Sequence, residues 1–235
     1  MITQLARRFR HSGFVGPRYK GVFGRARFFA ESVFGRREIL FVATPSTFVP
    51  ARMAGDSELH LHPITKFEDL APFREEFDRA FYPGYIDRWR APFTWGEQAV
   101  VGTIDGRVVS YNWIQRGTIA GFPTYYGRLF QDEARVLRGG VLPAYRGRGI
   151  NRVMKSYLLA ELFDDGANRV YGECYAGNVP SIRSLLGIGF KPFALITVLE
   201  IRPMRQFIRW HSSDILESTL QRLDVPRSVS GISAP

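Results

Sequence analysis

The sequence has little of what disulfide-rich, secreted or membrane-spanning proteins are built from. It contains one cysteine, Cys174, in 235 residues, which excludes an internal disulfide framework and fits a reducing compartment. No run of about 18 apolar residues occurs, so we expect no transmembrane helix. The first residues also lack the uninterrupted apolar stretch of a secretory signal. We therefore expect a cytoplasmic protein.

Metal-binding and common nucleotide-binding patterns are missing as well. His60 and His62 alternate along a strand-like run without cysteine or carboxylate partners at ligand spacing, so we expect no metal site. No Gly-Lys-Ser or Gly-Lys-Thr follows a glycine-rich loop, and no G-x-G-x-x-G occurs. These absences exclude a P-loop and the usual dinucleotide-binding turn.

Basic residues are plentiful and unevenly placed. The formal net charge is +10 at pH 7, and residues 1–38 hold nine basic residues against two acidic ones. Segments 5–10 and 24–29 mix arginine with phenylalanine, as interfacial helices and nucleic-acid arms do. Three interpretations of this basic N-terminal arm stay open. It packs on the core, which we favour; it contacts an anionic membrane or an acidic carrier protein; or, least favoured, it binds nucleic acid.

We divide the sequence into four parts. Residues 1–57 form the basic extension, with one strand expected at Glu38–Thr44, and residues 58–201 form the main domain. Residues 202–223 are expected to form a C-terminal helix whose apolar face suits a homodimer or a contact with the arm. Residues 224–235 have the composition of a disordered tail.

The most informative stretch is Gly140–Met154, GVLPAYRGRGINRVM, which predicts a strand, a loop and a helix. Gly147 and Gly149 lack the β-carbons that would crowd a bound anion, and the N–H groups that begin a helix point toward such an anion. Arg146 and Arg148 add positive charge to the same loop. The stretch therefore predicts a phosphate-binding site at a helix N-terminus.

The segments that follow alternate between helix and strand. A helix is expected over residues 150–165, then a strand at Arg169–Tyr175, a short helix after Asn178, and a strand at Phe193–Ile201 following Gly189 and Phe190. In the first helix an apolar stripe is expected at i, i+3, i+4 spacing, formed by Val153, Met154, Tyr157, Leu158, Glu161 and Leu162.

The segments that precede the loop predict more strands. Ala99–Ile104 and Arg107–Gln115 are β-rich and are joined by Asp105-Gly106, a strong hairpin signal. Leu59–Ile64 reads as a further strand, and residues 65–68, TKFE, resemble a capping box that opens a helix to about Ala80. The aromatic segment Phe81–Trp95 has two open interpretations: it walls an acceptor pocket, or it packs on the sheet.

This order of segments resembles the GNAT acyltransferase superfamily. The resemblance covers residues 58–201 and is carried by five motif positions, Arg146, Gly149, Asn178, Gly189 and Phe190. It implies an α/β (α+β) fold with a mixed, mostly antiparallel sheet flanked by helices, and with splayed parallel fourth and fifth strands at the cofactor site. Two positions depart from the pattern: Asn151 replaces a small residue, and Leu185 replaces the tyrosine that protonates the leaving thiolate in many members.

The resemblance implies an N-acyltransferase that uses acetyl-CoA, or another acyl-CoA, as co-substrate. The acceptor would be the amine of a small molecule, an amino acid or an amino sugar, reached by direct transfer. Ten residues are expected to bind the cofactor: Val141, Leu142, Arg146, Gly147, Arg148, Gly149, Ile150, Asn151, Asn178 and Ser181.

Catalysis needs a base for the amine and a proton or solvent for the thiolate. The candidate bases are Glu173 on the fifth strand and Asp132 and Glu133 before the fourth, each of which can instead be a solvated strand-end carboxylate. Tyr175 is a candidate acid. Two alternatives stay open for the whole protein: transfer of a long acyl chain from an acyl carrier protein, and a non-catalytic CoA-binding module.

Overall fold

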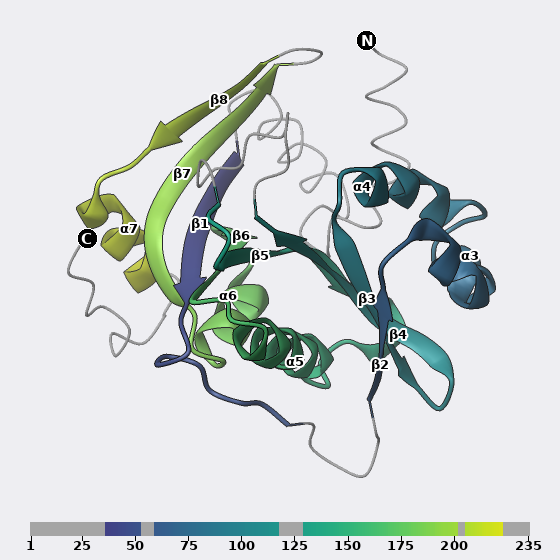
Figure 1. Cartoon of the computed structure of the whole chain (residues 1–235). Helices are drawn as coiled ribbons and strands as arrows, with labels where there is room; N and C mark the ends of the chain where they lie inside the picture. The colour runs from purple at the N-terminus through teal and green to yellow at the C-terminus, as the bar shows by residue number, and fades with distance from the viewer. Residues whose placement is uncertain (1–35, 53–58, 118–128, 202–204, 223–235) are drawn as a thin grey trace.

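The computed structural model describes residues 36–52, 59–117, 129–201 and 205–222, which are the coloured parts of Figure 1. The predictions made for residues 1–35 and for the tail after residue 222 lie outside these described residues. Strand Arg36–Ala43, labelled β1, is therefore where the description of the extension begins.

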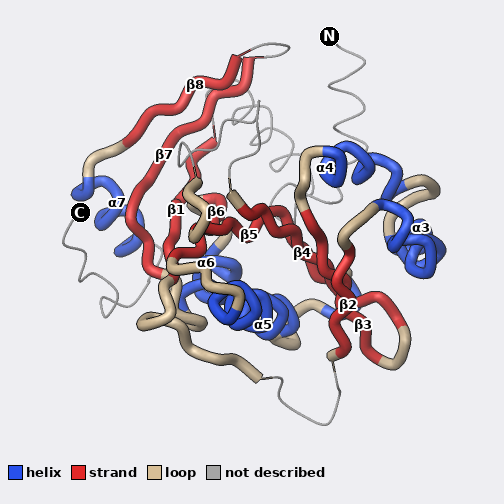
Figure 2. Tube along the Cα trace, viewed as in Figure 1, coloured by secondary structure: helices blue, strands red, loops and turns tan. Residues whose placement is uncertain are grey.

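The described strands form one curved sheet. Its order is β2-β3-β4-β5-β6-β1-β7-β8, and all neighbours are antiparallel except the parallel pair β5-β6. Figure 2 shows β7 and β8 at one end of the sheet and β2 to β4 at the other. The predicted mixed, mostly antiparallel fold is thus confirmed. The strands are β1 (Arg36–Ala43), β2 (His60–Ile64), β3 (Gln98–Ile104), β4 (Arg107–Arg116), β5 (Glu133–Val141), β6 (Arg169–Tyr175), β7 (Lys191–Ile201) and β8 (Arg205–Trp210).

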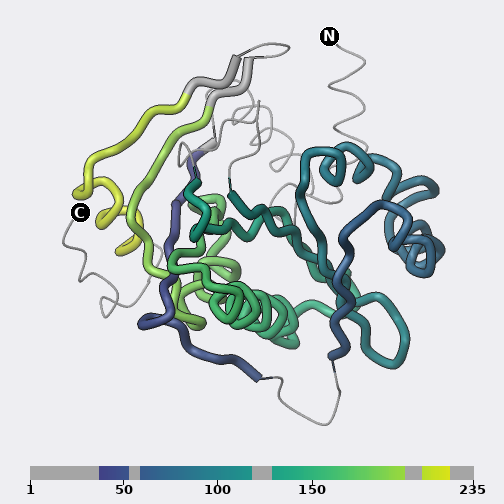
Figure 3. Tube along the Cα trace, viewed as in Figure 1, coloured from purple at the N-terminus to yellow at the C-terminus, as the bar shows by residue number. Residues whose placement is uncertain are grey.

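Strand β1 confirms the strand expected at Glu38–Thr44, and it lies inside the sheet. It pairs with β6 on one side, Glu38 opposite Tyr175, and with β7 on the other, Ile39 opposite Leu195. Figure 3 shows this purple strand running between the green strands that come late in the chain. A run of Ile, Leu, Phe and Val suits such a position because both faces of a central strand are buried.

The hairpin expected at Asp105-Gly106 is present between β3 and β4. Both turn residues have positive φ, +50° at Asp105 and +71° at Gly106, the backbone of a type I′ turn. This turn matches the twist of the flanking strands, so the sequence signal and the structure agree for a direct physical reason.

Helices α5 (Ile150–Asp164) and α6 (Val179–Leu186) cover one face of the sheet (Figure 1). The helix was predicted correctly, but its apolar stripe was placed wrongly. Tyr157 and Glu161 are exposed, whereas Lys155 and Leu159 are buried. Met154, Leu158 and Leu162 are buried as predicted, so the stripe was only partly misplaced. The core on this face gathers residues of β1, β5, β6, α5 and α6 around Met154, Leu158, Leu159 and Leu162.

The opposite face carries a layer of short helices: η3 (Phe67–Phe73), α3 (Arg74–Ala80), η4 (Tyr85–Trp89) and α4 (Arg90–Thr94). A helix begins after Thr65 as predicted, but the carboxylate that caps its N-terminus belongs to Asp69 and not to Glu68. Its Oδ2 accepts hydrogen bonds from the backbone N–H groups of Thr65 and Lys66. The N-cap is Lys66, one residue after Thr65, so the third helical position falls on Asp69 and not on Glu68.

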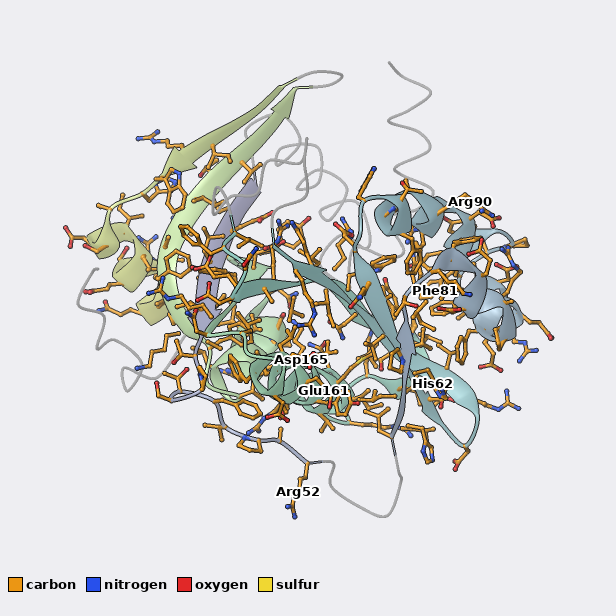
Figure 4. All side chains as sticks on the ribbon, in the orientation of Figure 1. Arg52, His62, Phe81, Arg90, Glu161 and Asp165 are labelled. Carbon is orange, nitrogen blue, oxygen red and sulfur yellow. The ribbon has the colours of Figure 1, made fainter. Side chains whose placement is uncertain are left out.

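Aromatic side chains fill the space between this helical layer and β4. Trp89 contacts Tyr111 and Trp113 with ring centroids 4.8 and 5.3 Å apart, and Phe77 lies among them. Tyr85, Ile86 and Trp89 are buried, so the packing interpretation of Phe81–Trp95 holds for these residues. Phe81, labelled in Figure 4, is partly buried and stacks on Tyr85 with ring centroids 4.0 Å apart, whereas Arg90, also labelled, is exposed.

The C-terminal prediction was half wrong. The structure has a strand, β8, and then helix α7 (Ser213–Arg222), in place of one helix over residues 202–223. Ile196 pairs with Trp210 and Val198 with Ile208, so β8 supplies hydrogen bonds to the edge of β7. The helical pattern of residues 205–210 is weak, and the edge of β7 offers these residues backbone partners. They form a strand there because each hydrogen bond between the two strands satisfies two backbone groups.

Candidate functional site

The loop before α5 presents free backbone donors. Gly149 is the N-cap of α5 with φ +76°, and Gly147 has φ +83°. No described residue accepts a hydrogen bond from the backbone N–H groups of residues 147–151. Consecutive unpaired donors at a helix N-terminus, with the helix dipole behind them, bind anions such as phosphate.

The two loop glycines are required chiefly by backbone conformation. A β-carbon added to Gly147 or Gly149 would meet nothing within 4 Å, so the protein itself leaves this space open. Positive φ disfavours any other residue type here. This open space lies at the loop where the sequence argument places a ligand.

The loop arginines lie at its surface. Arg146 donates from Nε to the carbonyl oxygen of Val141 at 3.1 Å, which leaves its terminal nitrogens available. Arg148 lies with its guanidinium 5.4 Å from the centre of the Tyr145 ring. Ile150 and Leu142 are buried and anchor the loop on both sides. Asn151 is half-buried in the first turn of α5.

Strands β5 and β6 separate next to this loop. They pair from Glu133 opposite Arg169 to Val136 opposite Gly172, after which β5 continues to Val141 and β6 to Tyr175 without pairing with each other. The opposite edge of β5 carries a bulge, where the register with β4 shifts between Tyr111 and Trp113. The separation leaves an edge of β5 beyond Val136 that an amide-rich ligand can pair with, as an added strand would.

Gly139 and Asn112 meet at the bulge. A β-carbon on Gly139 would lie 1.9 Å from Asn112 Oδ1, so only glycine fits there. Asn112 is fully buried; its Nδ2 donates to Met154 Sδ, while its Oδ1 has no hydrogen-bond partner among the described residues. A buried acceptor left open beside the separated strands is the kind of atom that a bound ligand or water satisfies.

Asn178 and Ser181 lie at the start of α6. Asn178 is the N-cap, and its Oδ1 accepts from the backbone N–H of Ser181 at 3.4 Å. This contact gives Asn178 a structural role at the far side of the separated strands, and the cap does not use its Nδ2 group. Both residues follow shortly after Tyr175, the last residue of β6.

Four charged side chains gather where β5 and β6 part, on the face that carries the helical layer. Glu173 pairs with Arg135 at 3.0 Å, and both are largely buried. Glu97, which precedes β3, forms an ion pair with Arg138 at the bulge. Arg138 lies over the Trp113 ring, 5.6 Å from its centroid, and is about half exposed. The predicted Glu173 thus belongs to a network that the sequence did not reveal.

Glu97 is the functional candidate that sequence reasoning missed. It is 3% exposed, and burial raises the pKa of its carboxyl, with Glu173 acting in the same direction and Arg138 and Arg135 opposing it. A buried carboxyl with a raised pKa is a common property of catalytic bases. The only sequence signal was a glutamate placed directly before an apolar strand, which does not by itself indicate burial.

Asp132 and Glu133 lie at the opposite end of β5 from the loop, roughly 25 Å along the strand from Val141 at about 3.3 Å per residue. Glu133 accepts from Tyr171 Oη at 2.8 Å and from the backbone N–H of Phe130 at 3.0 Å. Asp132 accepts from Asn168. Both carboxylates have structural partners, and the geometry does not bring either one to the loop; as bases they stay predictions.

Tyr175 and Leu185 lie on opposite faces of the sheet near the end of β6. Tyr175 shares the face of Glu173, because side chains alternate along a strand, and is half-buried. Leu185 is buried in the core on the other face, near Gly172, and has no proton to give. The described residues contain no cluster of three or more His, Cys, Asp or Glu side chains that could hold a metal ion.

A shallow cavity of about 100 Å³ lies elsewhere, between the β2–β4 end of the sheet and the outer side of α5. Tyr157 and Glu161 line it; Glu161 is labelled on α5 in Figure 4. This cavity is separate from the loop and from the parting of β5 and β6. Within the described parts of the chain, no helix is long and apolar enough to span a membrane.

The fold and the loop define an acyltransferase class, and a comparison with protein families agrees. Residues 69–190 match the sequence model of the acetyltransferase (GNAT) family. The chain belongs to the acetyltransferase (GNAT) family. The matched range begins in η3 and ends at Phe190, so it includes the loop, the separated strands and the helix after Asn178.

Solved structures of the same fold are similar at low sequence identity. A GNAT-family acetyltransferase from Colwellia psychrerythraea is 15% identical, with a TM-score of 0.46 over 67% of this chain and 53% of that one. A GCN5-related N-acetyltransferase from Kribbella flavida is 17% identical (TM-score 0.46; 74% and 62%). One from Sphaerobacter thermophilus is 14% identical (0.49; 81% and 57%). The chain thus spans less than two thirds of each of these proteins. No curated protein matches it.

Proposed function

We propose that this protein is an N-acyltransferase that moves an acetyl or other acyl group from acyl-CoA to the amine of a small molecule, such as an amino acid or an amino sugar. The observation that carries the proposal is the row of unpaired N–H groups at residues 147–151, beside the place where β5 and β6 separate from each other. A phosphate site next to a separated strand edge suits a ligand that carries a diphosphate followed by amides.

Each part of the chain then has a task in binding. The N–H groups of the loop and the guanidinium groups of Arg146 and Arg148 would hold the diphosphate. The backbone of residues 137–141 would pair with the amide-bearing arm, and Asn178 and Ser181 border it from β6. The bound co-substrate supplies a thioester carbonyl as the acyl donor. These residues fix its orientation and thereby lower the entropic cost of reaction.

Glu97 is the base that the geometry favours, with Glu173 as its neighbour. An amine acceptor arrives protonated at neutral pH and must lose protons to react. The buried Glu97 carboxyl has a raised pKa and lies in the charged network at the parting of the strands. Glu173, the other carboxylate of this network, forms an ion pair with the largely buried Arg135 at 3.0 Å.

Ligand-induced thermal stabilisation tests the proposal without knowledge of the acceptor. A ligand present at 100 times its dissociation constant adds about 2.7 kcal/mol to the free energy of unfolding. We expect acetyl-CoA, longer acyl-CoAs or free CoA to raise the melting temperature of the purified protein. No shift with any of them would contradict the proposal, and a shift with long chains alone would favour the carrier-protein alternative. The membrane and carrier contacts of the arm remain predictions.

A further inference from the structure

Arg138 lies at the bulge of β5, beyond the last residue that pairs with β6. At the bulge, β5 has two residues, Arg138 and Gly139, where β4 has only Asn112. An extra residue of this kind re-aims a side chain and is common beside active sites. Here the guanidinium of Arg138 lies over the Trp113 ring, 5.6 Å from its centroid.

The Trp113 ring is a fixed support for this guanidinium. It is 1% exposed, and it contacts the rings of Trp89 and Phe93 with centroids 5.3 and 4.9 Å away. A cation that lies on a packed aromatic ring is held in place by attraction to the ring face. The Arg138 side chain itself is 52% exposed, so the cation is both oriented and open to a ligand.

Glu97 uses only part of the hydrogen-bonding capacity of Arg138. The Nη2 group of Arg138 donates to Glu97 Oε2, and among the described residues Glu97 is the one carboxylate that pairs with it. A guanidinium has five N–H donors in a planar fork, so it can bind a second carboxylate beside the first. A ligand carboxylate on Arg138 would then lie next to Glu97.

We propose that Arg138 binds the carboxylate of the acceptor and that the acceptor is an α-amino acid. The proposal rests on the function proposed above and narrows its class of amines. Because Glu97 and Arg138 are in direct contact, a carboxylate bound to Arg138 and an amine at Glu97 must be close neighbours in the acceptor. A single carbon separates these two groups in an α-amino acid, whereas a simple amino sugar has no carboxylate.

The same contact couples acceptor binding to the strength of the base. Among the charges around Glu97, Arg138 opposes the rise in its carboxyl pKa most strongly, followed by Arg135, whereas Glu173 adds to the effect of burial. An acceptor carboxylate shares Arg138 with Glu97 and adds a negative charge beside it. Both changes raise the pKa of Glu97 further, so bound acceptor makes this carboxyl a stronger base.

The other ionisable groups on this face are accounted for. The hydroxyls of Tyr85 and Tyr111 lie 3.1 Å apart; burial raises the pKa of Tyr85 to about 12 and that of Tyr111 well above its usual value. Arg88 lies over the Tyr85 ring and stays protonated. Glu173, paired with Arg135, is the remaining carboxylate of the network, so a Glu173→Gln variant serves as its control.

The transfer step balances with this arrangement. The acceptor ammonium gives one proton to Glu97, and the free amine bonds to the thioester carbonyl carbon. The C–S bond breaks and its electron pair leaves on sulfur. The nitrogen then loses a second proton, which reaches the thiolate through solvent. The products are an amide and a thiol, and Glu97 returns its proton to solvent.

Acetyl-CoA with three kinds of acceptor tests the assignment: α-amino acids, the carboxamides of the same amino acids, and the matching amines without the carboxyl group. Release of free CoA is followed with a thiol-reactive dye. We expect kcat/KM for an α-amino acid to exceed that for its carboxamide about 10- to 100-fold, the value of charge-assisted hydrogen bonds to the carboxylate. Equal or higher kcat/KM for carboxamides, simple amines or amino sugars would overturn the proposal.

Arg138→Lys separates recognition from a structural role. Lysine keeps a positive charge for Glu97 but lacks the planar fork, so KM for the α-amino acid should rise about 10-fold or more while KM for the carboxamide stays unchanged. Arg116→Lys is the matched control, because Arg116 is 41% exposed and pairs with Asp165 at the other end of β4; it should change neither. Equal effects of Arg138→Lys on both acceptors would contradict recognition. Arg138→Gln takes its place if the lysine variant does not fold.

The pH profile tests the coupling to Glu97. Since kcat/KM reports the free enzyme and kcat the bound complex, the acidic limb of kcat should lie at higher pH than that of kcat/KM with an α-amino acid. With the carboxamide the two limbs should coincide, and Glu173→Gln should keep the difference between the acceptors. Coinciding limbs for both acceptors would contradict the coupling.

The outcomes separate this proposal from the proposed function. If acetyl-CoA raises the melting temperature and amines without a carboxylate are acetylated best, the assignment of Arg138 is wrong and the proposed function stands. If acetyl-CoA neither binds nor is consumed with any amine, the proposed function itself fails.

Discussion

At the scale of single residues, Gly189 illustrates what one missing side chain permits. Its φ is +95°, and a β-carbon there would lie 1.8 Å from the backbone carbonyl oxygen of Thr47. The Gly-Phe pair was recognised from the sequence by resemblance alone. The close approach of residues 44–49 could not be predicted, because it depends on a contact between segments that are far apart in the chain.

The first prediction concerns this glycine. Gly189→Ala should lower the free energy of unfolding by about 3 kcal/mol or more, since it combines positive φ with a backbone clash. Gly96→Ala is the matched control, with φ +81° and nothing within 4 Å of the added carbon; it should cost only about 1 kcal/mol. Urea denaturation measures both. Equal losses would show that the contact with Thr47 does not constrain the site.

The second prediction concerns Glu97. Because burial raises the pKa of its carboxyl, the acidic limb of kcat/KM should lie above the ordinary glutamate value of about 4.3. Below that limb Glu97 is protonated and cannot accept the proton of the amine. Glu97→Gln should remove the limb and lower kcat/KM by about 100-fold. Glu173→Gln is the comparison; if it removes the limb and Glu97→Gln does not, Glu173 is the base.

At the scale of elements, the predictions that rested on local sequence signals were correct, and those that depended on tertiary contacts were partly wrong. The loop before α5, the hairpin at Asp105-Gly106 and strand β6 were predicted because their turn chemistry is local. The buried face of α5 was misplaced, and β8 was taken for helix. Both differences arise where packing overrides pattern: Lys155 is buried although its side chain is charged, and β8 pairs with the edge of β7.

The third prediction tests whether the C-terminal elements belong to the main fold. Leu216 of α7 is 5% exposed and joins the core under α5, whereas its neighbour Ile215 is 40% exposed. Leu216→Ala should therefore lower the free energy of unfolding by about 2–5 kcal/mol, and Ile215→Ala by about 0.5 kcal/mol or less. Chemical denaturation measures the difference. Similar small effects would mean that α7 is a detachable appendage.

At the scale of the whole molecule, β1 ties the N-terminal part to the domain. The sequence suggested an extension that ends at residue 57, with one strand joining it to the core. In the structure that strand lies between β6 and β7 and supplies Ile39, Phe41 and Ala43 to the core. Strand order in a sheet is not encoded locally, so a continuous apolar run could predict the strand but not its neighbours in the sheet.

The fourth prediction follows from this position. Deletion of residues 1–34 leaves β1 intact, so the protein should fold, and its binding to anionic vesicles then reports what the basic arm contributes. Deletion of residues 1–44 removes β1 and leaves facing edges of β6 and β7 unpaired, so it should abolish cooperative unfolding. Circular dichroism with thermal melting distinguishes the two. A folded 1–44 deletion would show that β1 is dispensable.

The central claim is that the loop before α5 binds the diphosphate of acyl-CoA, and calorimetric titration with acetyl-CoA tests it most directly. We expect the wild-type protein to bind, and the double variant Arg146→Ala, Gly149→Ala to bind at least about 100-fold more weakly, since it loses a charge-assisted contact and strains the N-cap. The variant's melting temperature without ligand serves as the folding control. Undiminished affinity in a folded double variant would contradict the assignment of this loop.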